Sequence, residues 1–411
     1  MRRLLLQPLL TATLILIATT PISGLVLQGY SFSFHWQSPL FLAAAAFVLH
    51  LGLILGRIWS RNQFRPVAAL RLQKGAWATG PEWRRAMSLL LPAIGLALPF
   101  FLDKYGLTVA ILALIYVLLA LGLNIVVGLA GLLDMGFVAF YAVGAYGYAL
   151  GHHYLGLGFW TALPMAALLA AGCGLLLGFP VLRMHGDYLA IVTLGFGEII
   201  RLILNNWMDF TGGPNGVQVD FPTFMGLEFS RRAKEGGVPI HEFLGIAYSS
   251  NIRNIFIYLV LFLVVLLVLA LVTRLKYMPL GRTWEALRED EIACRSLGIN
   301  HVVVKLSAFA MGAMIGGVGG VFFAASQGFV NPTSFTFFES ALVLAIVVLG
   351  GLGSIPGVVI AAIVLTILPE LLRDFSGYRI LVFGLAMVAM MIWRPQGLIR
   401  PQRRIFLTGR H

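Results

Sequence analysis

The sequence predicts an all-α fold, a polytopic helical bundle that crosses a membrane many times. Of the 411 residues, 59% are hydrophobic and only 11% are charged, whereas soluble globular proteins carry about 25% charged residues. Apolar runs of about 18 residues or more recur along the whole chain, and each is long enough to cross a bilayer as a helix. The runs do not alternate with a period of two residues, as the strands of a transmembrane β-barrel do.

We expect about 10 core spans preceded by 2 N-terminal spans. The apolar runs place the helices near 5–27, 38–57, 86–102, 107–128, 132–151, 159–182, 187–207, 254–274, 305–327, 337–352, 355–372 and 378–393. The first run follows two arginines and resembles a signal peptide. Because no clear small-residue cleavage site follows it, we interpret it as an uncleaved anchor.

The spans divide into a two-span extension at 1–85, a core at 86–400 and a basic tail at 401–411. Two segments are rich in arginine: the loop between the second and third spans, and the tail. This pattern predicts a cytoplasmic location for both termini. The same count of crossings places 281–300 in the cytoplasm and 208–253 outside. The net charge of +12 therefore follows from membrane topology and does not indicate nucleic-acid binding.

The most polar stretch that still reads as a helix is Gly281–Asn300. Thr283 can cap its start, Glu285 suits the positive end of the helix dipole, and Gly298 can end it. Acids and bases are mixed around apolar side chains, so the stretch indicates docking on a protein; a solvated loop helix is the alternative. The residues expected to make the docking contacts are Trp284 and Leu287 as apolar anchors, with Glu285, Arg288, Glu289 and Glu291 as charges.

Two patterns lie inside the predicted spans. Gly312, Gly316 and Gly320 are four residues apart and form a small-residue stripe, which predicts close helix packing; lining a narrow path is the alternative. Glu198 and Arg201 are three residues apart on one helix and can pair. Charged side chains within a membrane span indicate a functional site. A purely structural ion pair is an equal alternative for these two residues.

The sequence contains no catalytic, metal-binding or nucleotide-binding motif of the kind found in soluble enzymes. No nucleophile elbow or zinc motif occurs, and no lysine follows a glycine as a P-loop requires. The two cysteines and the pair His152–His153 lack metal-ligand spacing. We therefore expect no enzymatic activity, no bound metal and no ATP site on this chain, so uphill transport would draw its energy from another protein or from an ion.

Several blocks in order carry a family resemblance. They are GLNIVVGLAGLLDMGFVAFYAVGAY (122–146), GFPVLRMHGDYLAIVTLGFGEIIR (178–201), TGGPNG (211–216), MPLGRTWEALREDEIACRSLGI (278–299), ESALVLAIVVLGGLGS (339–354) and MMIWRPQGL (390–398). With them, the chain resembles the LivM-type permease subunits of branched-chain amino acid ABC importers. The two-span extension is similar to that of the subunits from Gram-negative bacteria.

The resemblance implies a function and partners. It implies an inner-membrane permease that moves Leu, Ile and Val by alternating access. The implied partners are a homologous second permease, two ATP-binding subunits that bind ATP and Mg, and a periplasmic amino-acid-binding protein. It identifies 281–300 as the coupling region. Many ABC importers carry Glu-Ala-Ala, three residues and then Gly; here four residues separate Glu291-Ile292-Ala293 from Gly298.

Two other functions remain open at this point. One is an ABC permease for urea, amides or another small solute. The other is an ion-coupled secondary amino-acid carrier, which would be active without partner subunits. The mixed-charge helix at 281–300 and the scarcity of acids at mid-depth in the spans favour the ABC permease over the carrier.

Overall fold

The computed structural model describes residues 95–182, 184, 186–223, 227–229, 238–239 and 250–371, with 25–28, 31–34 and a few positions near 92 and between 384 and 399. The chain divides into two compact units, Met1–Arg85 and Ala86–His411. In the first unit, β1 (Leu25–Gln28) pairs antiparallel with β2 (Ser31–Phe34). The last residues of the predicted 5–27 span thus belong to a strand. The predicted span 38–57, most of 378–393 and part of 86–102 lie outside the described residues.

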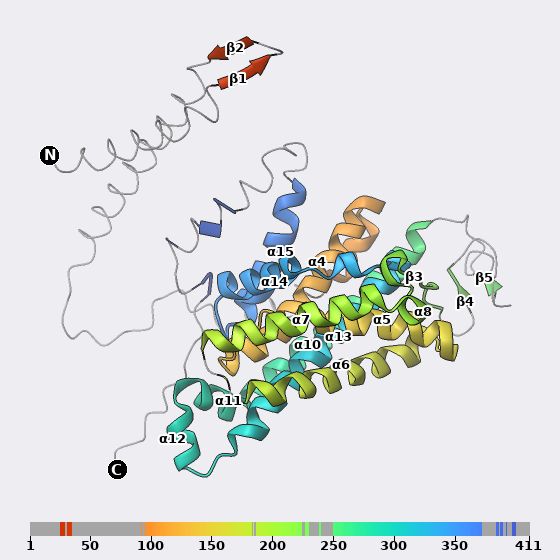
Figure 1. Cartoon of the computed structure of the whole chain (residues 1–411). Coiled ribbons are helices and arrows are strands. Elements are labelled where there is room, and N and C mark those ends of the chain that lie inside the picture. Colours follow the sequence, from red (N-terminus) through yellow and green to blue (C-terminus); the bar gives the residue numbers. More distant parts are fainter. Residues whose placement is uncertain are drawn as a thin grey trace, which may run out of the picture. The chain divides into compact units, whose positions relative to one another are not determined.

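The second unit is a helical bundle (Figure 1). After the short turn η2 (Leu98–Phe100), its long helices are α4 (Lys104–Leu123), α5 (Val138–Leu155), α6 (Phe159–Val181), α7 (Asp187–Asn206), α10 (Ser250–Tyr277), α13 (His301–Gln327), α14 (Phe337–Gly350) and α15 (Ile355–Leu371). Each overlies one of the predicted core spans. Six helical segments in the described part of the chain are long and apolar enough to cross a membrane. The prediction of a helical membrane bundle is confirmed in kind.

The core of the bundle lies around α13 and α4. In their most apolar windows, 78% and 72% of the residues are buried. Helix α13 packs on α6, α5 and α4, while α15 and α10 pack on α4. Side chains such as Phe309 and Phe322 of α13 and Leu118 of α4 are fully buried. The remaining helices are therefore arranged around two central ones.

A break separates α4 from α5. Helix α4 continues as a π-helical segment, η3 (Asn124–Leu129), and α5 begins only at Val138. The span predicted at 132–151 therefore starts six residues too early. Gly131 has a φ of +73°, a left-handed conformation that glycine adopts without steric cost. The Asp134 carboxylate accepts from the Gly136 N–H at 2.9 Å, which replaces the helical pattern there.

Short elements close one end of the bundle. They are α8 (Met208–Thr211), η4 (Gly213–Asn215), β3 (Val217–Gln218), β6 (Phe329–Val330) and η5 (Pro332–Ser334). Strand β3 pairs antiparallel with β6, which follows α13 directly. The TGGPNG stretch contains the turn η4, with positive φ at Gly212, Gly213 and Gly216. Elsewhere in the same loop, β4 (Leu227–Glu228) pairs with β5 (Val238–Pro239).

Candidate functional site

The stretch Gly281–Asn300 forms two helices, so the prediction of a single helix is wrong. They are α11 (Pro279–Glu289) and α12 (Glu291–Ser296), and the chain is extended at Asp290 between them. The Asp290 carboxylate accepts from the N–H groups of Ile292 and Ala293 at 2.8 and 3.0 Å. It therefore caps a new helix and satisfies donors that would otherwise be unpaired.

The predicted start of this stretch is also wrong, whereas its predicted end agrees with the structure. Met278 occupies the N-cap position of α11, with Pro279 in the first turn. Thr283 lies inside the helix and donates to the Leu280 carbonyl at 2.7 Å. A proline with a fixed φ suits the first turn, because its missing N–H would be unpaired there in any case. Gly298, with a φ of +80°, follows the end of α12.

Trp284 and Leu287 face the interior of this chain, which corrects their interpretation as exposed docking anchors. Trp284 is completely buried, and its indole N–H lies 3.0 Å from Ser307 Oγ and 3.2 Å from the Val304 carbonyl, both on α13. Leu287 is 5% exposed. An amphipathic helix packs its apolar stripe on the nearest apolar surface, and here that surface belongs to this chain. The two side chains attach α11 to α13.

The charges predicted for docking divide into two groups. Arg288 donates to the Gly128 carbonyl of η3, and Glu291 pairs with Lys305 of α13 at 2.8 Å. Glu285 and Glu289 lie on the exposed side of α11, where Glu285 is 3.9 Å from Lys276. Lys305 is only 2% exposed, and a buried ammonium without a partner is costly. Glu291 thus ties α12 to the central helix.

Backbone groups connect this region to two helix breaks in the bundle. Asn124 at the start of η3 accepts from the Gly353 N–H at 2.9 Å, and Lys276 of α10 donates to the Gly353 carbonyl at 2.7 Å. Gly353 lies in the turn between α14 and α15. With the bond from Arg288 to Gly128, these contacts join α10 and α11 to both breaks. Arg288 was predicted from the sequence as a docking charge, but this network was not predicted, because its partners are backbone groups distant in sequence.

Two apolar side chains are exposed on and beside α12 and were not predicted as anchors. Ile292 is 78% exposed and Leu297 is 80% exposed. Val303, in the first turn of α13, is 58% exposed. Cys294, between them in sequence, is buried. Asp290 is the sequence signal that could have predicted this exposure. An N-cap at this position starts a new helix, whose register turns Ile292 and Leu297 outward.

The glycine stripe lies where α13 approaches α4 and α5. A Cβ on Gly312 would lie 3.0 Å from the carbonyl oxygen of Gly122, and a Cβ on Gly316 would lie 3.1 Å from the Phe137 ring. A Cβ on Gly320 would overlap the carbonyl oxygen of Tyr141 and lie 2.5 Å from the Ala145 nitrogen. The backbones therefore approach as closely as small residues permit.

We expect Gly320→Ala to destabilise the protein by about 1–3 kcal/mol, because the methyl group would meet backbone atoms that have no alternative rotamer. Gly319→Ala is the matched control, since its nearest neighbour is the flexible Leu119 side chain at 3.3 Å. Thermal unfolding of both variants in detergent measures the difference. Equal midpoints for the two variants would contradict the close approach at Gly320.

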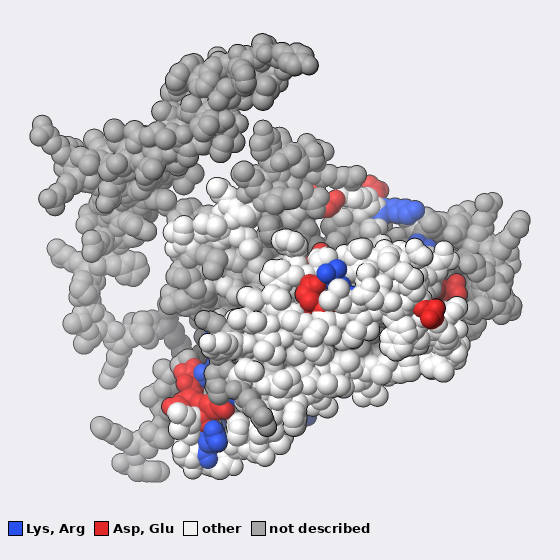
Figure 2. Space-filling view, viewed as in Figure 1, with Lys and Arg blue, Asp and Glu red and all other residues white. Residues whose placement is uncertain are grey.

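Glu198 and Arg201 form the ion pair that their spacing allows. The guanidinium of Arg201 lies 2.7 Å from the Glu198 carboxylate, and each side chain is 33% exposed. The pair lies on α7, whose buried residues include Leu189, Ala190, Thr193 and Leu204. Glu198 is on the side opposite Leu189, whereas Arg201, three turns after Ala190, borders the covered side. In Figure 2, a red and a blue patch lie side by side on a largely white face, over the helix labelled α7 in Figure 1.

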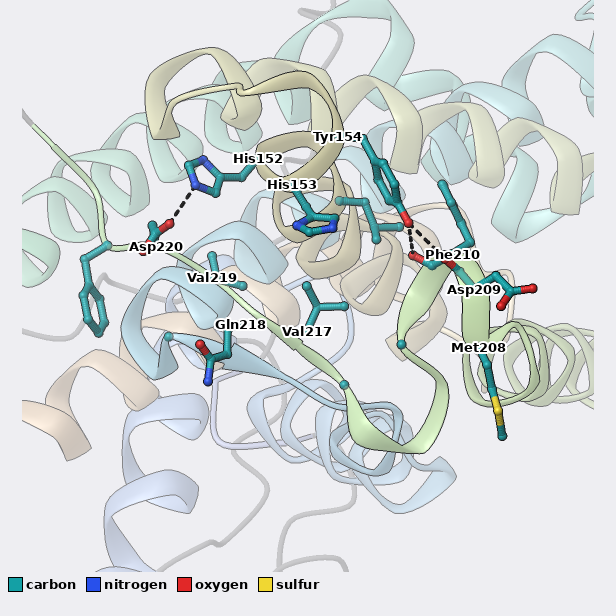
Figure 3. A pocket seen from close by; sticks show the side chains of 15 residues that line it. His152, His153, Tyr154, Met208, Asp209, Phe210, Val217, Gln218, Val219 and Asp220 are labelled. Atoms are coloured by element: carbon teal, nitrogen blue, oxygen red, sulfur yellow. Dashed lines mark hydrogen bonds and ion pairs between the residues drawn. The ribbon is translucent and has the colours of Figure 1, made fainter. Parts of the chain in front are cut away.

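A cavity of about 700 Å³ lies at the end of the bundle that carries β3 and β6. Figure 3 shows its polar side chains, which come from the end of α5, from α8 and from the segment around β3. His152 pairs with Asp220 at 2.9 Å, and the Tyr154 hydroxyl donates to the Asp209 carbonyl at 3.1 Å. Within the described residues, no three His, Cys, Asp or Glu side chains gather as metal ligands would.

The fold and these features define an integral membrane protein of the permease class. The family model described as "Branched-chain amino acid transport system / permease component" matches residues 105–393. The high-affinity branched-chain amino acid transport system permease protein LivM of Escherichia coli K12 is 57% identical over 320 residues, which cover 77% of this chain and 75% of that protein. The chain belongs to this family of transport-system permease components, and it is a membrane subunit without enzymatic activity of its own.

Two further relatives show the breadth of the family. LivM of Salmonella typhimurium LT2 is 56% identical over 324 residues, covering 78% of this chain and 76% of that protein. The permease protein LivH of Escherichia coli K12 is 25% identical over 304 residues, covering 70% of this chain and 92% of that protein. The chain is thus similar to two kinds of permease, and much more so to LivM. No solved structure matches the chain.

Proposed function

We propose that this chain is one of two membrane-spanning subunits of an ATP-binding-cassette importer that carries Leu, Ile and Val across the bacterial inner membrane. The observation that carries the proposal is the 57% identity to LivM, whose name states this transport system. The similarity to LivH indicates that the second permease subunit is a homologue of this chain. Two ATP-binding subunits would hold ATP and Mg, and a periplasmic amino-acid-binding protein would deliver the substrate.

The proposed topology has twelve crossings, with both termini in the cytoplasm. The arginine-rich loop and tail support it, because positively charged loops stay on the cytoplasmic side. With this orientation α11 and α12 are cytoplasmic. The cavity beside β3 and β6 opens to the periplasm, where the binding protein would dock.

We place the contact with an ATP-binding subunit on α12 and on the exposed side of α11. Ile292 and Leu297 would supply apolar contacts, and their 78% and 80% exposure in the isolated chain supports this assignment. Glu285 and Glu289 would lie at the rim and orient the contact. Trp284, Arg288 and Glu291 would transmit motion to α13 and η3, because they bind those elements. Gly298 would end the contact helix.

Purification of the native complex tests the proposal. Affinity capture of this chain should retain a homologous permease and two copies of ATP-binding subunits. Proteoliposomes containing the complex should take up leucine only with internal ATP and the binding protein outside. Uptake driven by an ion gradient without partners would favour a secondary carrier, and transport of urea or amides in place of leucine would overturn the substrate assignment.

A further inference from the structure

Helix α7 is the least covered of the six membrane-crossing segments. Only 22% of the residues in its most apolar window are buried, and its mean hydropathy is the lowest of the six. Tyr188 and Ile191 are 72% and 65% exposed, and Leu202 is 48% exposed. A Cβ on Gly195 would meet no atom within 4 Å. Among the described residues, one side of a membrane-crossing helix is therefore left uncovered.

Glu198 belongs to this open side, and its partner Arg201 lies at the edge of it. Residues 191, 195, 198 and 202 follow the spacing of three and four that aligns side chains on one face of a helix. Glu198 lies about 12 Å along the helix from Asn206, near the middle of a helix about 30 Å long, and Arg201 lies about 8 Å from that end. Figure 2 shows charge of both signs surrounded by uncharged surface in this region.

Lipid is an unfavourable neighbour for this pair. A charged group in the hydrocarbon layer costs several kcal/mol even after local adjustment, so such groups face protein or a water-filled cavity. Both side chains remain a third exposed, which means that the described residues do not enclose them. The open side of α7 must therefore meet something polar in the assembled complex.

We infer that this face lines the translocation path and that Glu198 and Arg201 bind the charged groups of a zwitterionic amino acid as it crosses the membrane. The inference rests on the proposed function and deepens it. Glu198 would accept from the α-ammonium group, and Arg201 would donate to the α-carboxylate as a planar fork. The cargo exchanges with the internal pair, so neither charge is left unpaired at any stage.

The rest of the face fits the remainder of such a cargo. Ile191 and Leu202 present aliphatic surface on either side of the charged pair, and Gly195 leaves room between them. An aliphatic amino acid has the same combination of one charged end and one apolar side chain. The C-terminal end of α7 lies next to the cavity in Figure 3, because α7 is followed directly by α8, whose Met208, Asp209 and Phe210 line that cavity.

Cysteine accessibility in the assembled complex tests whether the face is wet. In a background with Cys173→Ala and Cys294→Ala, Gly195→Cys and Leu202→Cys should react with a membrane-impermeant methanethiosulfonate. Reaction should slow when leucine-loaded binding protein and ATP are present. Leu263→Cys on α10 is the control, because Leu263 is 63% exposed on a span without charge nearby and should stay unreactive. Unreactive thiols at both α7 positions mean that lipid or the second permease covers the face, which overturns the inference.

Charge variants test the role of the pair. Glu198→Gln should reduce leucine uptake by roughly ten- to a hundredfold, the range that one charge-assisted hydrogen bond is worth, while ATP hydrolysis stimulated by the binding protein changes little. The swap Glu198→Arg with Arg201→Glu keeps an ion pair on the helix and controls for folding. It should assemble normally and still transport poorly, because the charges face the cargo in reversed order. Normal uptake by the swapped variant contradicts the inference.

These experiments distinguish a failure of this inference from a failure of the proposed function. If the unmodified complex takes up no leucine, the proposed function fails, whatever the variants do. If the unmodified complex transports leucine and the swapped pair transports equally well, the function stands and α7 serves only for packing or stability.

Discussion

Replacing Trp284 by alanine is expected to detach α11 from α13 and to destabilise the protein by about 3–5 kcal/mol, the usual cost of removing a buried aromatic side chain. The side chain is completely buried, and its indole N–H binds Ser307 and Val304. The loss leaves a cavity and removes both indole hydrogen bonds, although the Val304 carbonyl still accepts from the Ser307 hydroxyl at 2.8 Å. The unfolding midpoint of the purified protein in detergent, followed by fluorescence or calorimetry, measures the effect.

Leu280→Ala is the matched control for this prediction. Leu280 belongs to the same helix and is 37% exposed, so its truncation should cost well under half as much. Trp284→Phe should fall between the two, since it keeps most of the volume and loses only the hydrogen bonds. If Trp284→Ala unfolds at the same temperature as the unmodified protein but loses the ATP-binding subunits, the tryptophan acts as an intermolecular anchor after all.

The double change Ile292→Asp and Leu297→Asp is expected to abolish retention of the ATP-binding subunits without unfolding the permease. Both side chains are largely exposed, so their replacement leaves no cavity. A central anchor of a protein–protein contact can contribute about 2 kcal/mol or more, and each aspartate would in addition be desolvated without a partner, so affinity should fall at least tenfold for each residue. Co-purification of the complex and ATP-driven leucine uptake in proteoliposomes measure the loss.

Ser296→Asp controls for the added charge, because Ser296 is an exposed polar residue of the same helix. It should retain the partner subunits at near-normal levels. Glu285→Ala should also have a small effect, because exposed rim charges contribute little singly. Retention of both ATP-binding subunits by the double variant would show that α12 is not the contact surface.

The positions and lengths of the apolar runs in the sequence predicted the helices of the core well. Apolar runs near 159–182 and 305–327 match α6 and α13 to within a few residues, because the length of a membrane span is set by bilayer thickness. The apolar run at 132–151 begins six residues before the corresponding helix α5, which starts at Val138. There the backbone follows Gly131 and the hydrogen bond from Gly136 to Asp134, which a hydropathy pattern does not record.

The candidate site was less predictable, because it depends on contacts between distant residues. The amphipathic pattern of Gly281–Asn300 indicated that Trp284 and Leu287 would be buried, and it was interpreted as burial against a partner protein. In the structure, the Trp284 indole instead binds Ser307 and Val304 on α13 of the same chain, twenty or more residues further along the sequence. The ion pair of Glu198 and Arg201 was predictable from spacing alone, whereas the openness of α7 around it required the packed bundle.

The attachment of α12 to α13 has a mechanical consequence. The buried Lys305 ties α12 to one end of α13 through Glu291, and the pairing of β6 with β3 ties the other end to the loop beside the cavity. Helix α13 contains 27 residues and is about 40 Å long at 1.5 Å per residue. If it tilts as a rigid rod about the α12 end by 5°, its far end travels about 3.5 Å, on the order of one atomic diameter. A small rotation imposed at α12 thus becomes a displacement of several ångströms at the far end of α13, without any helix having to unfold.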